Sequence, residues 1–537
     1  MKQTLSAIFL FIISLSFAQQ KNLGNIKNVN PSSLNIIQDR GEIQGYYIYY
    51  ILDKVDRKNN LYQLEILDNN LQTTHKVEFT RPKATYFLGG SFNGETFCFG
   101  FASNQFKTIE YEIYDKQANK QSTYKVGKDG EGEISNLEVK PNSKGGQTYT
   151  SSLTAVPNNG YLRTYATGKK RNRAYLELFD NSGKKKWTFD MGQIETKIFE
   201  TMTVSYVNEK YVVVDYTSRK KQLSTKGMES IKFILDVNTG KKVGSYKVTN
   251  DKYSLSQYGT DYDAKNDQIY FYGEHFGLKA NGKINIKEKL GFFAFAIEPS
   301  GKLISQKYVT YREDVAKKIP LEERKKILDK RSIFIHKLVF LDNGKIYAIG
   351  EQYNKVVSAS GTALKVLGGL AGAATAGSNV QVSGQASAFE IHLHDMMVFE
   401  MSSSMALEKV HIIPKKRVTV GIPNGSGLSG EARLGYYINS LGLFEYSYTT
   451  IAPDRKSFNS VYINFDRKIK KKKENTSKYV VGYIGLDEDA DLSSGTFKIN
   501  GRPTWYRAIP AKTGYLSIFE YYKKEKKATA RLEKLDL

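Results

Sequence analysis

Residues 176–190 read LELFDNSGKKKWTFD, and residues 232–248 read KFILDVNTGKKVGSYKV. Both stretches begin with an apolar run that ends in an aspartate, Asp180 or Asp236. Both continue with a polar turn, a glycine and a pair of lysines. An aspartate after an apolar strand can hydrogen-bond the backbone of the next turn, and glycine supplies the positive φ that such hairpins need. The two stretches therefore predict one β-hairpin that is used twice.

The same unit recurs through the whole chain. A strand rich in Tyr, Phe and Val is followed by a polar hairpin, a second apolar strand, a turn, and a third strand rich in Lys and Val. The 37 Tyr, 28 Phe and 44 Gly suit short strands joined by tight turns. The intervals between units are mostly 47 to 70 residues. The second strands end at Asp68, Asp115, Asp180, Asp236, Pro299, Glu400, Asp466 and Asp536.

These units resemble known repeats. LDVNTGKKV is similar to the Asp-x-x-x-Gly-Lys stretch of quinoprotein-like β-propeller repeats, and FDNSGKKKW is a version with a shorter turn. Trp187 falls near the Trp that ends the family pattern, and FLDNGKIYAIG resembles propeller strands of the WD40-like kind. The seventh unit departs most, because Arg467 and Lys468 follow Asp466 without a turn glycine. The resemblance implies a propeller but no quinone, since no ligand set for a cofactor is recognisable.

We therefore predict an all-β fold, a β-propeller of eight (alternatively seven) four-stranded blades over residues 19–537. The last unit stops after its second strand, so the N-terminal segment KNLGNIKNV can supply the missing outer strand and close the ring. Two inserts interrupt the pattern. Residues 312–331 predict a short surface helix that begins at Pro320, and residues 358–387 predict a Gly/Ala-rich loop.

The first 18 residues predict a signal peptide that is cleaved after Ala18, since Lys2 precedes an apolar run and small residues stand before Gln19. The FAQQ ending resembles those of exported proteins of Bacteroidota. Neither this run nor a later one has membrane-spanning length. We expect a periplasmic or secreted protein without a transmembrane segment. Cys98 is the only cysteine, so no intramolecular disulfide can form.

Basic residues exceed acidic ones, with 79 Lys and Arg against 55 Asp and Glu and a formal charge of +24. This excess suggests an acidic partner. Lysine is spread evenly, and the Arg clusters with interleaved aromatics that nucleic-acid readers use are missing. We expect a monomer that binds a protein or an anionic glycan of the cell envelope, touches a membrane at most peripherally, and binds no nucleic acid.

Carboxylates recur where the first strand of a unit ends. Equivalent positions of a propeller point to one rim, so these acids can form an arc around the axis. Such an arc could bind a cation or a cationic ligand, or provide paired acids for glycoside chemistry. The alternative is that each acid ends a strand in solvent. The five residues are Asp215, Glu274, Glu351, Glu445 and Glu520.

Two further stretches contain candidate metal ligands. FEIHLHD places Glu390, His392 and His394 on one strand face, which suits zinc or merely a polar, solvent-facing side. GLDEDADLSSG alternates aspartates as calcium loops do, but Leu492 stands where the turn glycine belongs. An acidic turn is the better interpretation there.

Two classes of function remain open. The absence of a Gly-x-Ser-x-Gly elbow and of a phosphate-binding glycine loop favours a non-enzymatic binding platform for an envelope protein or glycan. The alternative is a carbohydrate-active hydrolase or lyase that uses the rim carboxylates. That alternative requires two of the acids to lie within roughly 5 to 10 Å of each other, with the pKa of one raised.

Overall fold

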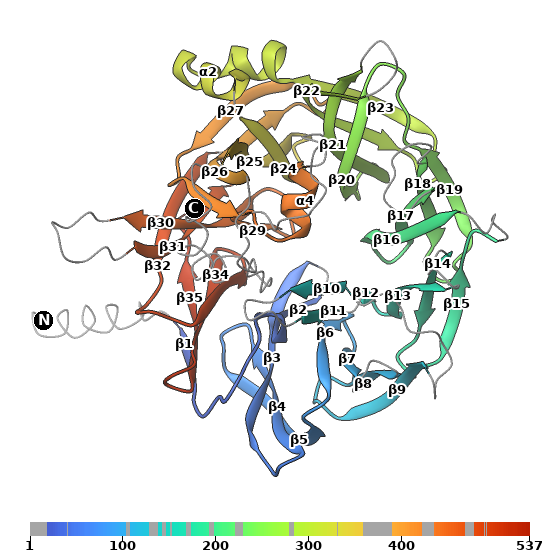
Figure 1. The fold of residues 1–537 in the computed structure, drawn as a ribbon, viewed down its shortest axis with the longest axis vertical. Coiled ribbons are helices and arrows are strands. Elements are labelled where there is room, and N and C mark those ends of the chain that lie inside the picture. The colour runs from blue at the N-terminus through green and yellow to red at the C-terminus, as the bar shows by residue number, and fades with distance from the viewer. Residues whose placement is uncertain are drawn as a thin grey trace, which may run out of the picture.

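The computed structural model is a ring of eight four-stranded antiparallel sheets, so the protein is an eight-bladed β-propeller (Figure 1). This confirms the predicted fold, with eight blades and not seven. The structure describes residues 19–536 except residues 40, 104–107, 128–137, 142–146, 151–152, 168–172, 193–197, 221–228, 279–283, 330, 358–388, 422–433, 468–476, 488 and 490. The predicted signal peptide and the predicted Gly/Ala-rich loop lie outside the described residues.

We call the strands of each blade A to D from the centre of the ring outwards. The first four blades are β2–β5 (Leu34–Asp39, Glu42–Lys54, Asn59–Asp68, Thr73–Pro82), β6–β9 (Tyr86–Phe92, Phe97–Ala102, Thr108–Tyr114, Lys120–Gly127), β12–β15 (Thr154–Val156, Gly160–Thr167, Arg173–Phe179, Lys185–Phe189) and β16–β19 (Phe199–Val207, Tyr211–Arg219, Glu229–Asp236, Lys242–Lys247).

Blades 5 to 7 follow the same order, and blade 8 combines both ends of the chain. These blades are β20–β23 (Ser254–Asp263, Gln268–Leu278, Ile284–Ile297, Leu303–Thr310), β24–β27 (Ser332–Phe340, Ile346–Val357, Phe389–Met401, Leu407–Ile413), β29–β32 (Tyr446–Ile451, Phe458–Arg467, Ser477–Leu486, Leu492–Lys498), and β33, β34, β35 and β1 (Trp505–Pro510, Tyr515–Tyr522, Lys527–Lys534, Gln20–Leu23).

A few elements lie outside the regular blades. The hairpin β10–β11 (Glu138–Pro141, Gln147–Thr150) is a separate sheet, and β28 (Val418–Gly421) pairs with β26. Figure 1 shows helix α2 outside the ring beside β27, and α4 on its inner side near β24 and β29. Within the predicted 312–331 insert, α2 begins directly after Pro320. The helical elements are η1 (Pro31–Ser33), η3 (Tyr311–Val315), η4 (Ala316–Lys318), α2 (Leu321–Asp329) and α4 (Leu434–Ser440).

The ring is closed by the N-terminal strand, as predicted. β1 pairs antiparallel with β35, with Gln20 opposite Arg531, and supplies strand D of blade 8. On strand A of the same blade, the indole Nε1 of Trp505 donates a hydrogen bond of 3.1 Å to the carbonyl of Val29, in the segment that leads from β1 to blade 1. One sheet and one tryptophan therefore hold the two chain ends together.

The repeated aspartate has a structural role in the turn between strands C and D. Oδ1 of Asp68 accepts hydrogen bonds from the backbone N–H of Asn70 (2.9 Å) and Gln72 (2.7 Å). Asp180 repeats the pattern with residues two and four positions later. The intervening residue has positive φ, +65° at Leu71 and +74° at Gly183. The aspartate thus satisfies the backbone donors of a turn that the chain uses repeatedly.

The assignment of the seventh unit from the sequence is wrong. Asp466, expected at the end of the second strand of the unit, lies in β30, which is strand B of blade 7. Strand C is β31, and Asp487 follows it; its Oδ1 accepts the N–H of Asp491 at 2.8 Å. The stretch with alternating aspartates is therefore the C–D turn of blade 7. This explains why no turn glycine follows Asp466.

Apolar side chains fill the space between neighbouring blades. In the part of the chain that the structure describes, a buried cluster lies between each blade and the next, including one between blades 8 and 1 around Leu34, Tyr46 and Phe519. The outer strands carry many exposed lysines, as in KQSTYKVG of β9 and KVGSYK of β19. Lysine on an edge strand opposes pairing with another chain. Part of the positive charge therefore protects the outer edges of the blades.

Candidate functional site

The five predicted carboxylates occupy neighbouring blades. Four lie on strand B, and Glu445 lies directly before strand A of blade 7. The side chain of Asp215 is 35% exposed, whereas the other four are at most 3% exposed. None of these four ends a strand in solvent.

Glu351 and Glu445 are brought together across the boundary between blades 6 and 7. Nζ of Lys415 lies 3.1 Å from Oε1 of Glu351 and also binds Oε2 of Glu445. Oε2 of Glu351 accepts the backbone N–H groups of Glu445 and Tyr446, both at 3.1 Å, and lies 3.5 Å from Nε2 of His336. The acids are bound to basic groups and backbone donors of their own chain.

The electrostatics of this cluster follow from its burial. Burial alone would raise the pKa of Glu351, but the charges of Lys415 and His336 outweigh it and lower the pKa. Burial and the nearby Glu351 charge raise the pKa of Glu445, against the opposing effect of Lys415. Burial would lower the pKa of Lys415, and the two carboxylates reverse this. The cluster therefore contains an ion pair, between Glu351 and Lys415, and a second acid, Glu445, that is protonated more easily than an ordinary glutamate.

Glu274 lies in a buried, tyrosine-lined setting beside this cluster. The hydroxyl of Tyr353 donates to its Oε1 at 3.1 Å. Burial first and then the charge of Glu274 raise the pKa of Tyr258 and Tyr311 well above the ordinary value. Helix α4 covers the site closely, because a Cβ on Gly435 would lie 3.3 Å from Oε2 of Glu274.

Asp215 and Glu520 bind cationic side chains within their own blades. Asp215 pairs with Lys232 on the adjacent strand C, whose side chain is 1% exposed. Burial lowers the pKa of Lys232, and Asp215 opposes that effect. Oε1 of Glu520 lies 2.7 Å from Nη1 of Arg531. These two acids are in blades 4 and 8, apart from the acids of blades 5 to 7.

The predicted metal ligands share β26 in blade 6. Nε2 of His394 lies 2.7 Å from Oδ1 of Asn354, and Nε2 of His392 lies 4.0 Å from Oε2 of Glu390. Burial and then the nearby Arg331 charge lower the pKa of His394 to about 3. Among the residues that the structure describes, no three His, Cys, Asp or Glu side chains are grouped as metal ligands would be.

A pocket of about 360 Å³ opens where blades 7, 8 and 1 meet, and we call it the seam pocket. It is lined by the A–B hairpins of these blades, at residues 450–453 and 457–459, 511–513 and 41–44, together with Asn69. Strands of a blade alternate in direction, so the A–B and C–D turns lie on the same side of the ring. We call that side the turn face; the seam pocket opens on it.

A smaller pocket, of about 90 Å³, is also built from turns of this face. It is lined by parts of the A–B hairpins of blades 5, 6 and 7, including Lys265, Asp342 and Arg455. Neither pocket includes any of the five predicted carboxylates. The seam pocket was not predicted, because its residues come from three regions that are far apart in the sequence.

Sequence reasoning also missed a recurrent buried glutamate. In the first three blades it stands three residues before the repeated aspartate, in LEILD, YEIYD and LELFD. Its side chain is at most 4% exposed on strand C and binds strand D of the preceding blade. The sequence did contain a signal for this glutamate, because a charged residue inside an otherwise apolar strand indicates a buried polar partner. The pairs are Glu65 with Lys21, Glu112 with Arg81, and Glu177 with Tyr124.

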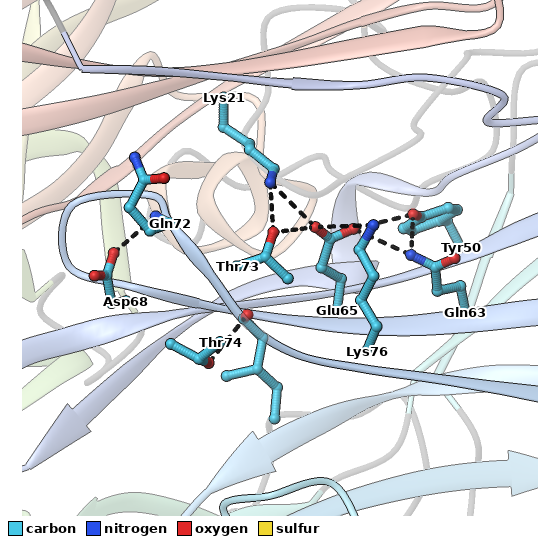
Figure 2. Close-up of polar contacts among 10 residues, drawn as sticks. Lys21, Tyr50, Gln63, Glu65, Asp68, Gln72, Thr73, Thr74 and Lys76 are labelled. Carbon is cyan, nitrogen blue, oxygen red and sulfur yellow. Dashed lines mark hydrogen bonds and ion pairs between the residues drawn. The ribbon is translucent and has the colours of Figure 1, made fainter.

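Glu65 shows the arrangement in detail (Figure 2). Its Oε1 accepts the hydroxyl of Thr73 at 2.5 Å and lies 3.5 Å from Nζ of Lys21. Its Oε2 accepts the hydroxyl of Tyr50 and the amide of Gln63, each at 3.1 Å. Lys21 lies on β1 of blade 8, and the other residues lie in blade 1. The network therefore crosses the boundary between blades 8 and 1, which we call the seam, and reinforces ring closure.

We compared the chain with protein families, with curated proteins and with solved structures. The family described as "Family of unknown function (DUF6770)" matches residues 1–536. No curated protein matches the chain. None of the helices in the described part is long and apolar enough to cross a membrane.

Three solved structures illustrate the distant similarity. Prolyl oligopeptidase B from Galerina marginata is 8% identical, with 94% of this chain covered and a TM-score of 0.38. A post-proline cleaving enzyme from Rickettsia typhi is 9% identical, with 91% covered and a TM-score of 0.37. This chain spans 55% and 58% of the lengths of these two proteins. A DUF4221 member from Bacteroides vulgatus is 9% identical, with 88% of this chain and 100% of that chain covered and a TM-score of 0.30.

Proposed function

For a chain that belongs to the DUF6770 family, described as a family of unknown function, we propose a non-catalytic role as a binding platform. The propeller presents its turn face to a protein or glycan of the cell envelope. The platform is exported by a cleaved signal peptide, and it acts as a monomer in the periplasm or outside the cell. Any contact with a membrane is peripheral.

The observation that carries this proposal is the seam pocket. Three A–B hairpins and one C–D turn converge on it, and loops on a rigid scaffold are where binding residues concentrate. The pocket lies at the junction of the blades that hold both chain ends. Ring closure therefore positions its lining.

The enzyme alternative has one observation in its favour. Glu351 and Glu445 bind the same Lys415 ammonium, and the pKa of Glu445 is raised. Against it, both side chains are at most 3% exposed and belong to neither described pocket. A glycosidic bond must reach both acids, so burial favours a structural role for the pair.

The two ends of one strand provide the test. Gln44 is an exposed residue of β3 in the seam pocket, and Val55, 53% exposed, follows the other end of β3 on the opposite face. Solubilised envelope of the producing cell is passed over immobilised wild type, Gln44→Trp and Val55→Trp proteins. Mass spectrometry and sugar analysis then identify what each retains.

We expect wild type and Val55→Trp to retain the same component, and Gln44→Trp to lose it, because the indole would fill the pocket. Retention that is equal for all three proteins would place binding elsewhere. Wild-type protein that retains nothing from the envelope would overturn the platform role.

A further inference from the structure

The polar lining of the seam pocket is mostly neutral. Side-chain amides and hydroxyls are contributed by Gln44, Asn69, Thr450, Asn459 and Thr513. Such groups both donate and accept hydrogen bonds, which matches ligands rich in hydroxyl or amide groups. The volume of about 360 Å³ is at the low end of small-molecule sites, roughly 300–1,000 Å³.

One amide in this lining is incompletely satisfied. Asn459 is 8% exposed, and its Oδ1 is buried and accepts no hydrogen bond from the residues that the structure describes. Asn459 projects from the same side of β30 as Val461, which packs against blade 8. This is the side on which residues 511–513 line the pocket. A buried acceptor without a donor costs free energy, and a ligand O–H or N–H in the pocket would relieve it.

Among the described residues of the lining, two are charged, and their charges have opposite sign. Glu42 is exposed at the pocket mouth. Lys512 carries the opposite charge, and its ammonium group already has hydrogen-bond partners: Nζ donates to Oδ1 of Asn70 at 2.6 Å and to Oε1 of Gln19 at 3.3 Å. The excess positive charge of the protein lies partly on the outer strands. The formal charges of the described lining residues therefore cancel, which gives no preference for a charged ligand.

The described lining also lacks the side chains that anchor protein partners. It contains no Trp, Tyr or Arg, the residue types that dominate binding energy at protein interfaces. Its apolar members include Ile43, Phe458 and Ala511, which are at most 6% exposed and belong to the blade cores. A ligand in the pocket would therefore meet mainly amides, hydroxyls and hairpin backbone.

We infer that the seam pocket binds a neutral, hydroxyl-rich ligand, namely a short stretch or chain end of an uncharged oligosaccharide. This inference rests on the proposed binding role and names its ligand class. The hydroxyls of the ligand would donate to Oδ1 of Asn459. They would also donate to, and accept hydrogen bonds from, the side chains of Gln44 and Thr450 in the pocket lining.

The test is a panel of neutral, anionic and cationic oligosaccharides with the full-length mature protein. The panel includes cellobiose, maltose and N,N′-diacetylchitobiose, and the deacetylated form of the last as a cationic match. Binding is measured by saturation-transfer NMR and calorimetry for wild type, Gln44→Trp, Asn459→Leu and Val55→Trp. Asn464→Leu is a second control. Asn464 lies on the same strand as Asn459, and its Oδ1 already accepts the N–H of Lys416 at 3.0 Å. Circular dichroism establishes that each variant is folded.

We expect at least one neutral oligosaccharide to bind, with affinity lost in Gln44→Trp, reduced at least tenfold in Asn459→Leu and unchanged in Val55→Trp. If only charged sugars or an envelope protein bind, and Gln44→Trp still abolishes binding, the ligand class is wrong and the platform role stands. If no envelope component or sugar binds in a way that depends on Gln44, both are overturned.

Discussion

The indole ring of Trp187 lies against the backbone of Gly240: a Cβ atom on Gly240 would fall 2.5 Å from Cδ2 of Trp187. The indole Nε1 donates a hydrogen bond of 3.1 Å to the carbonyl of Val237. Trp187 is on strand D of blade 3, and Gly240 is in the C–D turn of blade 4. The two copies of the repeated hairpin that first indicated the fold therefore contact each other.

Gly240→Ala should destabilise the protein more than Gly514→Ala. Both glycines have positive φ, +66° and +76°, so both substitutions incur roughly 1 kcal/mol of backbone strain. Only at Gly240 does the new methyl group collide with a ring, because nothing lies within 4 Å of a Cβ on Gly514. We expect a further loss of about 1–3 kcal/mol at Gly240, measured by urea unfolding. Equal losses would show that the indole moves aside freely.

Replacing Glu65 by Leu should weaken the seam. The substitution leaves the buried hydroxyl of Tyr50 without its acceptor. The amide of Gln63 loses one of its two acceptors and still donates to the Tyr50 hydroxyl at 2.6 Å. The expected loss is about 1–3 kcal/mol in the free energy of unfolding, because Lys21 is partly solvated and adds little. Glu42→Leu, at an exposed position, is the control and should change stability by less than about 0.5 kcal/mol.

The two acids bound to Lys415 should respond differently to substitution by glutamine. Glu351 has a lowered pKa and accepts two backbone N–H groups, so Glu351→Gln should lose about 3 kcal/mol. Glu445 has a raised pKa and is closer to its neutral form, so Glu445→Gln should lose about 1 kcal/mol. Guanidinium unfolding at pH 7 gives both values. A larger loss for Glu445→Gln would reverse the assignment of the charged partner.

Acid should destabilise the protein partly through His275. Burial lowers the pKa of this imidazole from 6.5 to about 4. The folded chain then binds fewer protons than the unfolded chain between these values, so the free energy of unfolding falls as the pH falls through this window. The loss approaches about 3 kcal/mol at roughly 1.4 kcal/mol per pKa unit.

His275→Phe tests that origin, because phenylalanine keeps an aromatic ring against Tyr253 and Tyr308 and does not titrate. Its stability should change less with pH between 6.5 and 4 than that of the wild type. His75→Phe, on the outer strand β5, is the control. If His275→Phe has the same pH dependence as wild type, other groups cause the acid effect.

The predicted fold rested on the end of strand C, which was identified correctly in seven units; an aspartate marks it in five of them, and Pro299 and Glu400 stand there in the other two. Strand A was not recognised, because its residues are half-buried without a regular pattern, as in YSYTTI of β29. In blade 7 the wrong aspartate was chosen because both β30 and β31 are apolar and each has an acidic residue at or near its end. Local patterns therefore predicted the repeat but not the complete blade.

The acids were recognised as a recurrent set, but their partners were not. Lys415 is 64 residues from Glu351 in sequence, and no local pattern links them. The seam pocket depends even more on closure, since residues 41–44 and 511–513 meet only when the ring is complete. Sites of this kind follow from tertiary structure alone.

Because the first and last strands pair in blade 8, the two ends of the chain lie side by side, and the ring resembles a closed chain with one break in it. Joining Gln19 to the C-terminal end and opening a B–C loop instead would keep every strand pairing, so such a permutant should fold to the same ring. The position of the natural cut has a thermodynamic consequence. A molecule that bridges residues 41–44 and 511–513 also fastens the two ends of the chain, so occupancy and closure stabilise each other through linkage.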